Sequence, residues 1–175
     1  MVAMEEDEHA RRAARGDEVA FAALVSMLAP RVRAFLYRLD PSAADDLAQE
    51  TFLKAWQRRA AWRGSERGGG SYAGWVLRIA WTVFLDRKRS DERRRAREAA
   101  AEPPMSTPRD PELGAALEQA LATLDPRERA AAELCFAQGF SHSEAARILA
   151  VPLGTAKTLI ARARAKLVHL LGEPT

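Results

Sequence analysis

Apolar residues recur at spacings of three and four along almost the whole chain, and no stretch alternates between apolar and polar residues as a strand does. This spacing places the apolar side chains on one face of a helix. Asp17 is suited to cap a first helix, which Pro30 is expected to break or restart. Another helix is predicted over residues 42–62. The pattern therefore predicts an all-α protein.

The helix predicted over 42–62 carries a polar stripe beside its apolar one. The stripe recurs at three, four and seven residues and consists of Asp46, Gln49, Glu50 and Leu53. A polar stripe that includes a leucine suits a protein-binding face, although an ordinary solvated face is slightly favoured by these residues alone. A metal or acid–base cluster built on Asp45, Asp46 and Glu50 is disfavoured, because no His or Cys lies nearby in the sequence.

A loop is predicted over residues 62–72, followed by a helix that Ser71 can cap. The loop contains consecutive glycines but lacks the lysine and Ser/Thr of a phosphate-binding loop. Aromatic residues next to arginines can stack on unpaired bases, which makes this helix a candidate for holding single-stranded DNA. Core packing is the favoured role for Trp75, and both roles remain open for Trp81.

Prolines gather between residues 103 and 111, just after a stretch that has lost its apolar face. We therefore expect a flexible linker at 101–110 that divides the chain into a helical domain at 10–100 and a second at 111–172. Asp110–Pro111 and Asp125–Pro126 each combine a cap with a first helical turn, so each should begin a helix.

Residues 139–167 have the pattern of two helices joined by a tight turn. Ser141 and Glu144 form a predicted capping box, and Pro152 interrupts the apolar pattern before the second helix. The polar faces of that second helix are basic and carry Thr155, Lys157, Thr158, Arg162 and Arg164. This arrangement fits a helix-turn-helix that reads DNA, and the alternative is a helical hairpin with a solvated basic face.

The charge distribution, the cysteine and histidine positions and the lack of long apolar runs limit the classes of function that this chain can have. The formal net charge is only +3 but the sequence pI is ≈ 9.4, and the positive charge is concentrated in short basic runs, as phosphate binding requires. A single cysteine, Cys135, excludes an internal disulfide, and its spacing from His9, His142 and His169 suggests neither a metal site nor a nucleophile. The polar start resembles no signal peptide, and no apolar run approaches the ~20 residues of a membrane span. We expect a cytoplasmic protein without cofactor, enzymatic activity or membrane insertion.

Taken together, the two halves resemble a bacterial RNA polymerase sigma factor of the extracytoplasmic-function group. DDLAQETFLKAW at 45–56, followed by WVLRIAWTVFLDRKR at 75–89, resembles sigma region two. LDPRERAAAELCFAQGFSHSEAARILAVPLGTAKTLIARARAKL at 124–167 resembles sigma region four. The resemblance covers nearly the whole chain and implies a promoter-specificity factor for core RNA polymerase that catalyses no reaction itself.

The resemblance implies a role for each candidate surface. The stripe formed by Asp46, Gln49, Glu50 and Leu53 would contact the clamp helices of the polymerase. The −10 element, including a base flipped out of the stack, would be held by Trp62, Arg63, Tyr72, Arg78, Trp81 and Thr82. The −35 element would be read in the major groove by Thr155, Lys157, Thr158, Arg162 and Arg164. An anti-sigma protein is a further expected partner, beside core polymerase and promoter DNA.

Two departures from the family pattern bear on DNA recognition. Trp81 and Thr82 stand where the family usually has Arg-Asn, and Leu159 stands where it usually has arginine. Leu159 is expected to meet a thymine methyl group or a protein surface instead. Two rival functions remain open: a polymerase-independent helix-turn-helix repressor or activator, and a sigma-like decoy that binds only protein.

Overall fold

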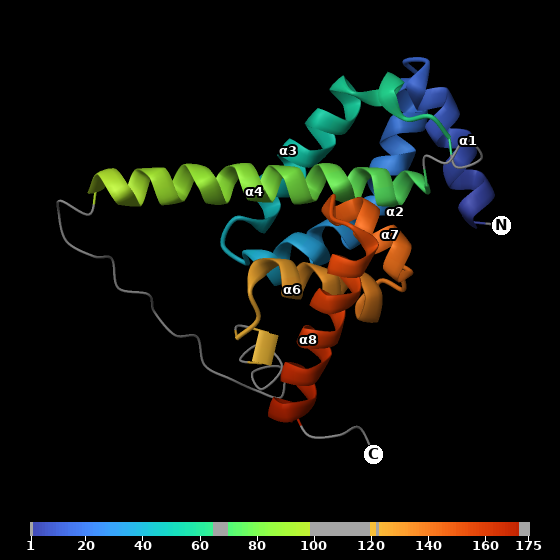
Figure 1. The fold of residues 1–175 in the computed structure, drawn as a ribbon. Coiled ribbons are helices and arrows are strands. Elements are labelled where there is room, and N and C mark those ends of the chain that lie inside the picture. Colours follow the sequence, from blue (N-terminus) through green and yellow to red (C-terminus); the bar gives the residue numbers. More distant parts are fainter. Residues whose placement is uncertain (1, 65–69, 99–119, 122, 172–175) are drawn as a thin grey trace.

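The structure, a computed structural model, describes residues 2–64, 70–98, 120–121 and 123–171. Every regular element in this part of the chain is helical, which confirms the all-α prediction. The first group of elements is α1 (Val2–Ala14), α2 (Glu18–Leu39), α3 (Ala44–Gln57), the 3-10 turn η1 (Arg59–Ala61) and α4 (Tyr72–Glu98). The second group is α6 (Pro126–Ala132), the π-helical turn η3 (Glu133–Ala137), α7 (His142–Leu149) and α8 (Leu153–Leu171) (Figure 1).

The two groups of helices pack against each other. α4 lies between them, with α1 and α3 on one side and α7 on the other, and α2 crosses α4 so that its later part meets α6 (Figure 1). A single cluster of buried residues runs through both groups and includes Leu36, Val76, Leu134 and Ile148. The linker predicted at 101–110 lies outside the described residues, so the proposed domain boundary stays a prediction.

Pro30 does not interrupt α2, contrary to the sequence-based expectation. The helix continues through it from Glu18 to Leu39. An internal proline costs about 3 kcal/mol, whereas each fully buried large apolar side chain contributes about 1.5–3 kcal/mol. Leu24, Leu28, Val32 and Phe35 are all buried along the same face of α2, so their combined burial outweighs the cost of the proline.

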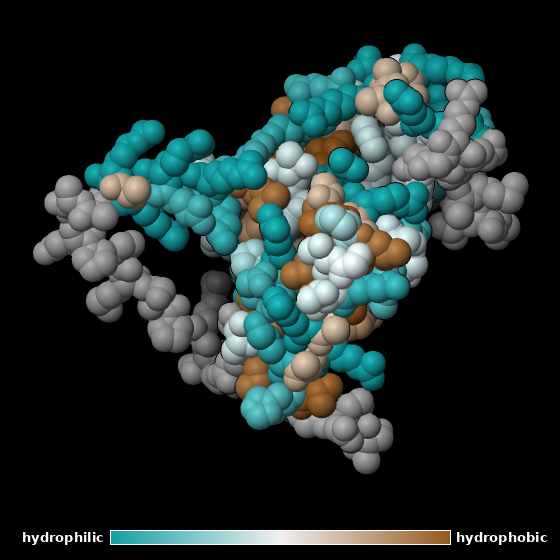
Figure 2. Space-filling model, in the orientation of Figure 1, coloured by the Kyte–Doolittle hydropathy of each residue, from teal (hydrophilic) through white to brown (hydrophobic). Residues whose placement is uncertain are grey.

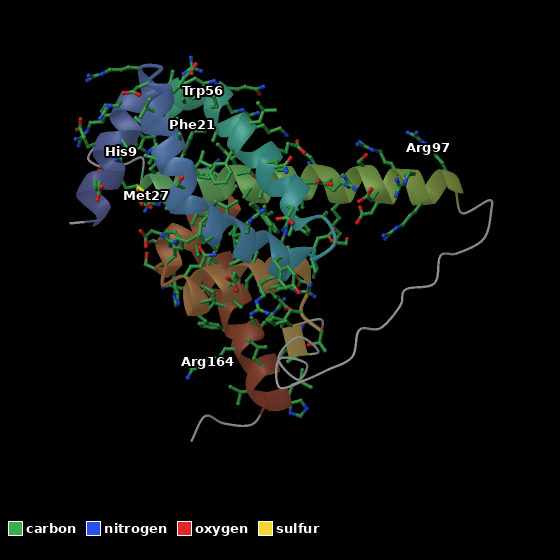
Figure 3. The ribbon with its side chains drawn as sticks, turned by 180° about the vertical axis from the view of Figure 1, so that it is seen from behind. His9, Phe21, Met27, Trp56, Arg97 and Arg164 are labelled. Carbon is green, nitrogen blue, oxygen red and sulfur yellow. The ribbon has the colours of Figure 1, made fainter. Side chains whose placement is uncertain are left out.

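By length and composition alone, α2 could also cross a membrane, contrary to the expectation that no apolar run is long enough. The core helix of a water-soluble bundle passes the same test. Here α2 packs against α1, α3, α4 and α6, and Phe21 on α2 lies 5.0 Å from Trp56 of α3 between ring centroids (Figure 3). Its position in the bundle explains its apolar character.

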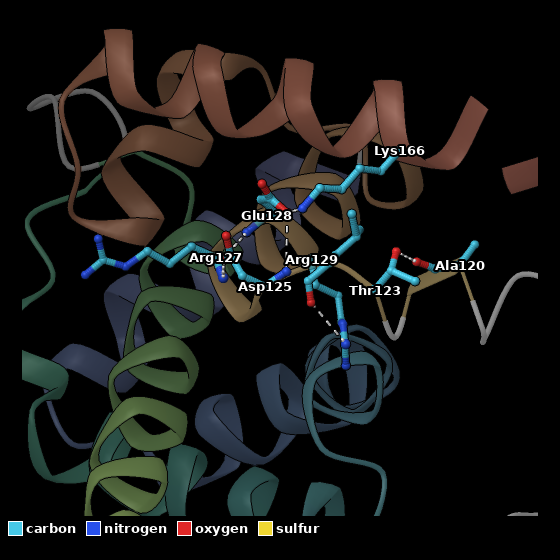
Figure 4. Close-up of polar contacts among 8 residues, drawn as sticks. Ala120, Thr123, Asp125, Arg127, Glu128, Arg129 and Lys166 are labelled. Carbon is cyan, nitrogen blue, oxygen red and sulfur yellow. Dashed lines mark hydrogen bonds and ion pairs between the residues drawn. The ribbon is translucent and has the colours of Figure 1, made fainter. Parts of the chain in front are cut away.

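The carboxyl-terminal group is tied together at the start of α6 (Figure 4). Asp125 caps this helix by accepting hydrogen bonds from the backbone N–H groups of Arg127 and Glu128, as predicted. Glu128 is 3% exposed and its carboxylate lies 2.6 Å from the ammonium group of Lys166 on α8. Arg129 donates a hydrogen bond of 3.2 Å to the carbonyl of Arg38, which joins α6 to α2.

The segment after α6 continues as the π-helical turn η3. The backbone N–H of Gln138 bonds to the carbonyl of Glu133 at 3.0 Å, five residues back. Leu134 in this turn is fully buried, whereas Phe136 is 52% exposed. Two residues further along a helix is about 200° around it, so these two side chains point to opposite sides.

Candidate functional site

Three surfaces carry the residues singled out by the sequence. The first is the α3 stripe, whose members Asp46, Gln49, Glu50 and Leu53 are all exposed. The residues behind it, Leu47, Thr51 and Ala55, are buried, and the hydroxyl of Thr51 bonds to the carbonyl of Leu47 at 2.7 Å. Packing therefore fixes the helix and leaves the stripe open to solvent.

The α3 stripe combines an exposed leucine with acidic groups. Leu53 is 57% exposed, between the charged residues Glu50 and Lys54 of the same helix. Glu50 is paired with Lys54 at 2.7 Å, and neighbouring Asp45 is paired with Arg33 at 2.9 Å. An apolar side chain next to carboxylates is suited to docking against a protein surface that offers a hydrophobic contact and basic residues.

The second surface lies on α4 and on the chain just before it. Arg63, Arg78 and Thr82 are exposed, as contact with DNA would require. Trp62 and Tyr72, predicted to face the −10 element, are only 7% and 2% exposed. In this structure these two rings are core residues and offer no stacking surface to solvent.

The buried rings hold together the ends of the loop at 62–72. Trp62 packs edge-on against Tyr72 with 5.4 Å between ring centroids, and Tyr72 lies 5.3 Å from Trp75. Burial, and to a smaller degree the negative charge of Glu6, raises the pKa of the Tyr72 hydroxyl well above its usual value. Tyr72 therefore stays neutral, and its ring joins Trp62 at the start of the loop to Trp75 on α4.

Two further expectations are corrected by burial. Trp81, for which core packing and base stacking were both open, is 3% exposed and stacks on Phe84 with 5.5 Å between centroids. Leu159, expected to meet a thymine methyl group or a protein surface, is 8% exposed and belongs to the core. Both departures from the family pattern therefore place a large apolar side chain in packing.

The contact between α4 and α7 was not foreseen from the sequence. The guanidinium of Arg78 donates a hydrogen bond of 3.3 Å to the carbonyl of Arg147, at the end of α7. Arg78, Trp75, Glu144 and Arg147 line a cleft of about 340 Å³ between the two helices. A Cβ at Gly74 would lie at ordinary contact distance from the residues across the cleft, 3.8 Å from the Phe140 ring and 3.9 Å from Ile148, so the approach of the two helices does not itself require glycine there.

A second pair of contacts joins α2 to the segment after η3. Arg31 lies over the ring of Phe140 at 5.1 Å, and its guanidinium donates to the carbonyl of Gln138 at 3.4 Å. The amide of Gln138 returns a hydrogen bond of 3.2 Å to the carbonyl of Arg31. Such long-range pairings leave no periodic signal in the sequence.

The third surface is α8 with the turn before it. Ser141 and Glu144 form the predicted capping box, and these hydrogen bonds to Ser141 lower the pKa of the Glu144 carboxyl. α7 is capped at its carboxyl end by Ala150, which adopts left-handed backbone geometry with φ 54°. The five predicted DNA contacts on α8 are all exposed: Thr155, Lys157, Thr158, Arg162 and Arg164 (Figure 3 shows Arg164).

The exposed residues of α8 lie along the two edges of its buried face and on the side between them that faces away from the core. Successive residues are 100° apart around an α-helix, so Lys157 and Arg164 lie along one edge of the buried face. Thr155 and Arg162 lie along the other edge, and Thr158 lies between them on the side facing away from the core. Among the described residues, no group of three His, Cys, Asp or Glu side chains is placed to hold a metal ion.

Comparison with known proteins gives one family match over the part of the chain that carries the first two surfaces and another over the part that carries the third. The family models described as Sigma-70 region 2 and Sigma-70, region 4 match residues 24–94 and 114–167. The ECF RNA polymerase sigma factor SigE of Mycolicibacterium smegmatis is 36% identical over 174 residues, and the match covers 91% of this chain and 66% of SigE. EcfG of Rhodopseudomonas palustris is 37% identical over 152 residues, with 81% and 80% covered.

A solved structure shows the same fold. The sigma factor RpoE of Bartonella quintana, in complex with the anti-sigma factor NepR, matches with a TM-score of 0.75 and 27% identity. The match covers 89% of this chain and 98% of the RpoE chain. The present chain thus spans nearly all of RpoE as solved, but just under two thirds of the length of SigE.

Proposed function

Because the chain belongs to the extracytoplasmic-function family of RNA polymerase sigma factors, we propose that it directs core RNA polymerase to promoters and initiates DNA-templated transcription there. The observation that carries this proposal is the presence, on one chain, of an exposed α3 stripe and an exposed basic α8 within matches to regions 2 and 4. Sigma factors act by binding polymerase and DNA, so the proposed role needs no catalytic group or cofactor. The expected site of action is the cytoplasm.

The α3 stripe is the proposed contact with core polymerase. Asp46, Gln49, Glu50 and Leu53 point to solvent from one face of a helix whose opposite face is buried. Leu53 would supply apolar burial, and the carboxylates would select a basic partner surface and orient it. A DNA-binding repressor that works without polymerase has no need of such a face.

The exposed residues of α4 are the proposed contacts with the −10 element. Arg78 and Thr82 lie one helical turn apart on the same side of α4, and Arg63 lies at the start of the loop before it. The buried rings of Trp62, Tyr72 and Trp81 would act indirectly, by fixing the position of the loop and of α4. A base flipped into this region would be received by the loop and not by these rings.

The positions of the exposed residues around α8 suggest that some contact bases of the −35 element and others contact its phosphates. A helix in the major groove presents its outward side to base edges and its flanks to the two phosphate backbones. Thr158 is therefore the proposed base contact, whereas Lys157 and Arg164 face one backbone and Arg162 faces the other.

An anti-sigma protein is a further proposed partner. The similar RpoE structure contains its anti-sigma factor NepR, and RpoE is matched over 98% of its length by this chain. Packing of the two helix groups engages the guanidinium of Arg78 in a hydrogen bond to Arg147, although the side chain stays exposed. A protein that stabilised this arrangement would therefore compete with promoter DNA for Arg78.

Transcription in vitro tests the proposal. The protein is added to purified core polymerase with a library of upstream fragments from the source genome. Discrete transcripts that require the protein are expected, and alignment of their start regions gives the recognised elements. Binding to core polymerase without any transcript would favour the decoy function, and binding to DNA without polymerase would favour the independent regulator.

A further inference from the structure

The carboxyl-terminal third of α4 extends beyond the core. Leu85 is the last large apolar residue of this helix, and every residue from Glu92 to Arg97 is exposed. In Figure 1 this end of α4 projects away from the other helices, and Figure 3 shows Arg97 near its tip. The projecting end is mostly hydrophilic over its visible surface (Figure 2). We refer to residues 87–97 as the arm.

Ion pairs within the arm explain why it stays helical without a packing partner. Asp91 pairs with Arg87 at 3.1 Å and with Arg94 at 3.8 Å, and Glu92 approaches Lys88 to 3.8 Å. Each pair spans three or four residues, the spacing that stabilises an isolated helix by about 0.2–0.5 kcal/mol. The acidic residues of the arm are thus engaged in holding its shape.

The arm keeps a strong excess of positive charge. It contains seven basic residues against two acidic ones. Arg93, Arg95 and Arg97 make no ion pair with any other residue in the described part of the chain. Ser90, Arg93, Arg94 and Arg97 line a hollow of about 400 Å³ on one side of the helix.

This basic side continues the face of α4 that carries the proposed −10 contacts. At 100° per residue, Arg93 lies about 60° around the helix from Arg78, and Arg97 lies about 100° from Arg78 in the same direction. Thr82, at about 40°, lies between Arg78 and Arg93 when the helix is viewed along its axis. Arg95 lies about 160° from both Arg93 and Arg97, on the other side of the arm, and about 100° from Arg78 in the other direction. With a rise of 1.5 Å per residue, Arg93 is about 22 Å further along the axis than Arg78.

We propose that Arg93 and Arg97, on the arm of α4, bind backbone phosphates of the double-stranded DNA between the −10 and −35 elements. The inference rests on the proposed function, because it takes promoter DNA as the ligand of α4. Duplex DNA is favoured as the partner because the arm continues the DNA-facing side of a single rigid helix. Guanidinium groups pair with phosphate oxygens through two hydrogen bonds each, and such contacts position a protein on DNA without reading its sequence.

Salt dependence of promoter binding by the holoenzyme tests the inference. Affinity falls as salt rises, and each lost phosphate contact reduces the steepness of log affinity against log salt by about 0.9. R93Q/R97Q should therefore lower the slope by about two relative to the wild type. Glutamine is close to arginine in helix propensity, so the arm should stay helical, and circular dichroism checks this. R95Q is the matched control and should leave the slope unchanged.

A DNA modification gives an independent measurement. Methylphosphonate links remove the charge from chosen phosphates in the DNA between the two promoter elements. They should weaken binding by the wild-type holoenzyme and have little effect on R93Q/R97Q, since two changes to one contact are not additive.

Three outcomes would overturn the inference. R93Q/R97Q could keep the wild-type salt slope, or R95Q could reduce the slope by as much per removed charge as R93Q/R97Q does. R93Q/R97Q could also bind core polymerase more weakly than the wild type. Failure of the proposed function itself would look different, because the wild-type protein would then start no transcript.

Discussion

The carboxylate of Glu6 accepts a hydrogen bond of 2.8 Å from the backbone N–H of Ala73, the second residue of α4. Glu6 is 9% exposed and belongs to α1, a helix that precedes the match to region 2. The first N–H groups of a helix have no partner within it, and they favour a negative charge. α1 thus caps the helix that carries the proposed −10 contacts.

Replacing Glu6 by alanine should therefore destabilise the protein. A hydrogen bond to a charged group contributes about 1.5–3 kcal/mol, and the variant would leave the Ala73 N–H buried without its partner. Urea unfolding should show a loss of this size. Glu5→Ala removes an exposed acid from the same helix and should change the free energy of unfolding by less than about 0.5 kcal/mol. Equal losses in the two variants would contradict the capping role.

Ala150 should be replaceable by glycine with a gain in stability. Its φ of 54° costs an L-residue about 1–2 kcal/mol, and glycine removes this strain while adding about 0.4–1 kcal/mol of unfolded-state entropy. We expect Ala150→Gly to raise the free energy of unfolding by up to about 1 kcal/mol. Ala161→Gly, at an exposed position inside α8, should lower it by about 1 kcal/mol. Thermal unfolding of the two variants should give shifts of opposite sign.

The capping box at Ser141 makes the start of α7 sensitive to acid. Hydrogen bonds to Ser141 hold the pKa of Glu144 below its unfolded value, so the folded state is favoured while this carboxyl is ionised. That contribution is present above about pH 4.3 and is lost as the pH falls through the lowered pKa. The stability difference between the wild type and Glu144→Gln should therefore shrink below about pH 4.3. A constant difference from pH 7 to pH 3 would show that the ionised carboxylate contributes nothing.

Charge reversal of the α3 stripe should abolish binding to polymerase. Asp46→Lys with Glu50→Lys places two positive charges on an exposed face, so the protein should remain folded by circular dichroism. Co-purification with core polymerase is the measurement. Glu5→Lys is the control, because Glu5, like Asp46, is an exposed acid in the first turn of a helix. Wild-type yield of the complex from the double variant would remove the stripe from the interface.

Lys157 and Thr158 should differ in their effects on promoter binding. Lys157→Ala is expected to weaken binding to all promoters and to lower the salt slope by about one, as loss of a phosphate contact does. Thr158→Ala should leave the slope unchanged and alter preference at one base pair of the −35 element. Titrations at several salt concentrations, on matched and mutated promoters, separate the two. An unchanged slope for Lys157→Ala would show that this lysine makes no phosphate contact.

The carboxyl-terminal helices could be predicted closely because their signals are local. Asp125 and Ser141 each mark a helix start, and the capping hydrogen bonds of both are present. The three- and four-residue spacing of apolar residues in 153–170 likewise predicts one buried side of α8. Ala156, Ile160 and Ala163 are buried there. Leu153 and Leu170, at the two ends of this pattern, are 44% and 49% exposed. Caps and helical periods depend on residues within one or two turns, which a single sequence contains in full.

Features that depend on distant residues could not be predicted. α1 shows only a small apolar face, formed by Ala10 and Ala13, and gains its place through α2 and the cap it gives to α4. The burial of Trp62 and Tyr72 also arises from packing across the bundle. An aromatic side chain beside an arginine gives the same local pattern whether it faces bases or the core, so sequence alone could not assign these rings.

The hydrogen bond between Arg78 and Arg147 ties one proposed −10 contact to the helix group that carries the proposed −35 contacts. The Arg78 side chain is exposed and lines the cleft between α4 and α7, so DNA can reach it. For a chain that acts as proposed, a phosphate or base that takes this guanidinium competes with the Arg147 carbonyl. Engagement of the −10 element at Arg78 is therefore coupled to loosening of the contact between the two helix groups.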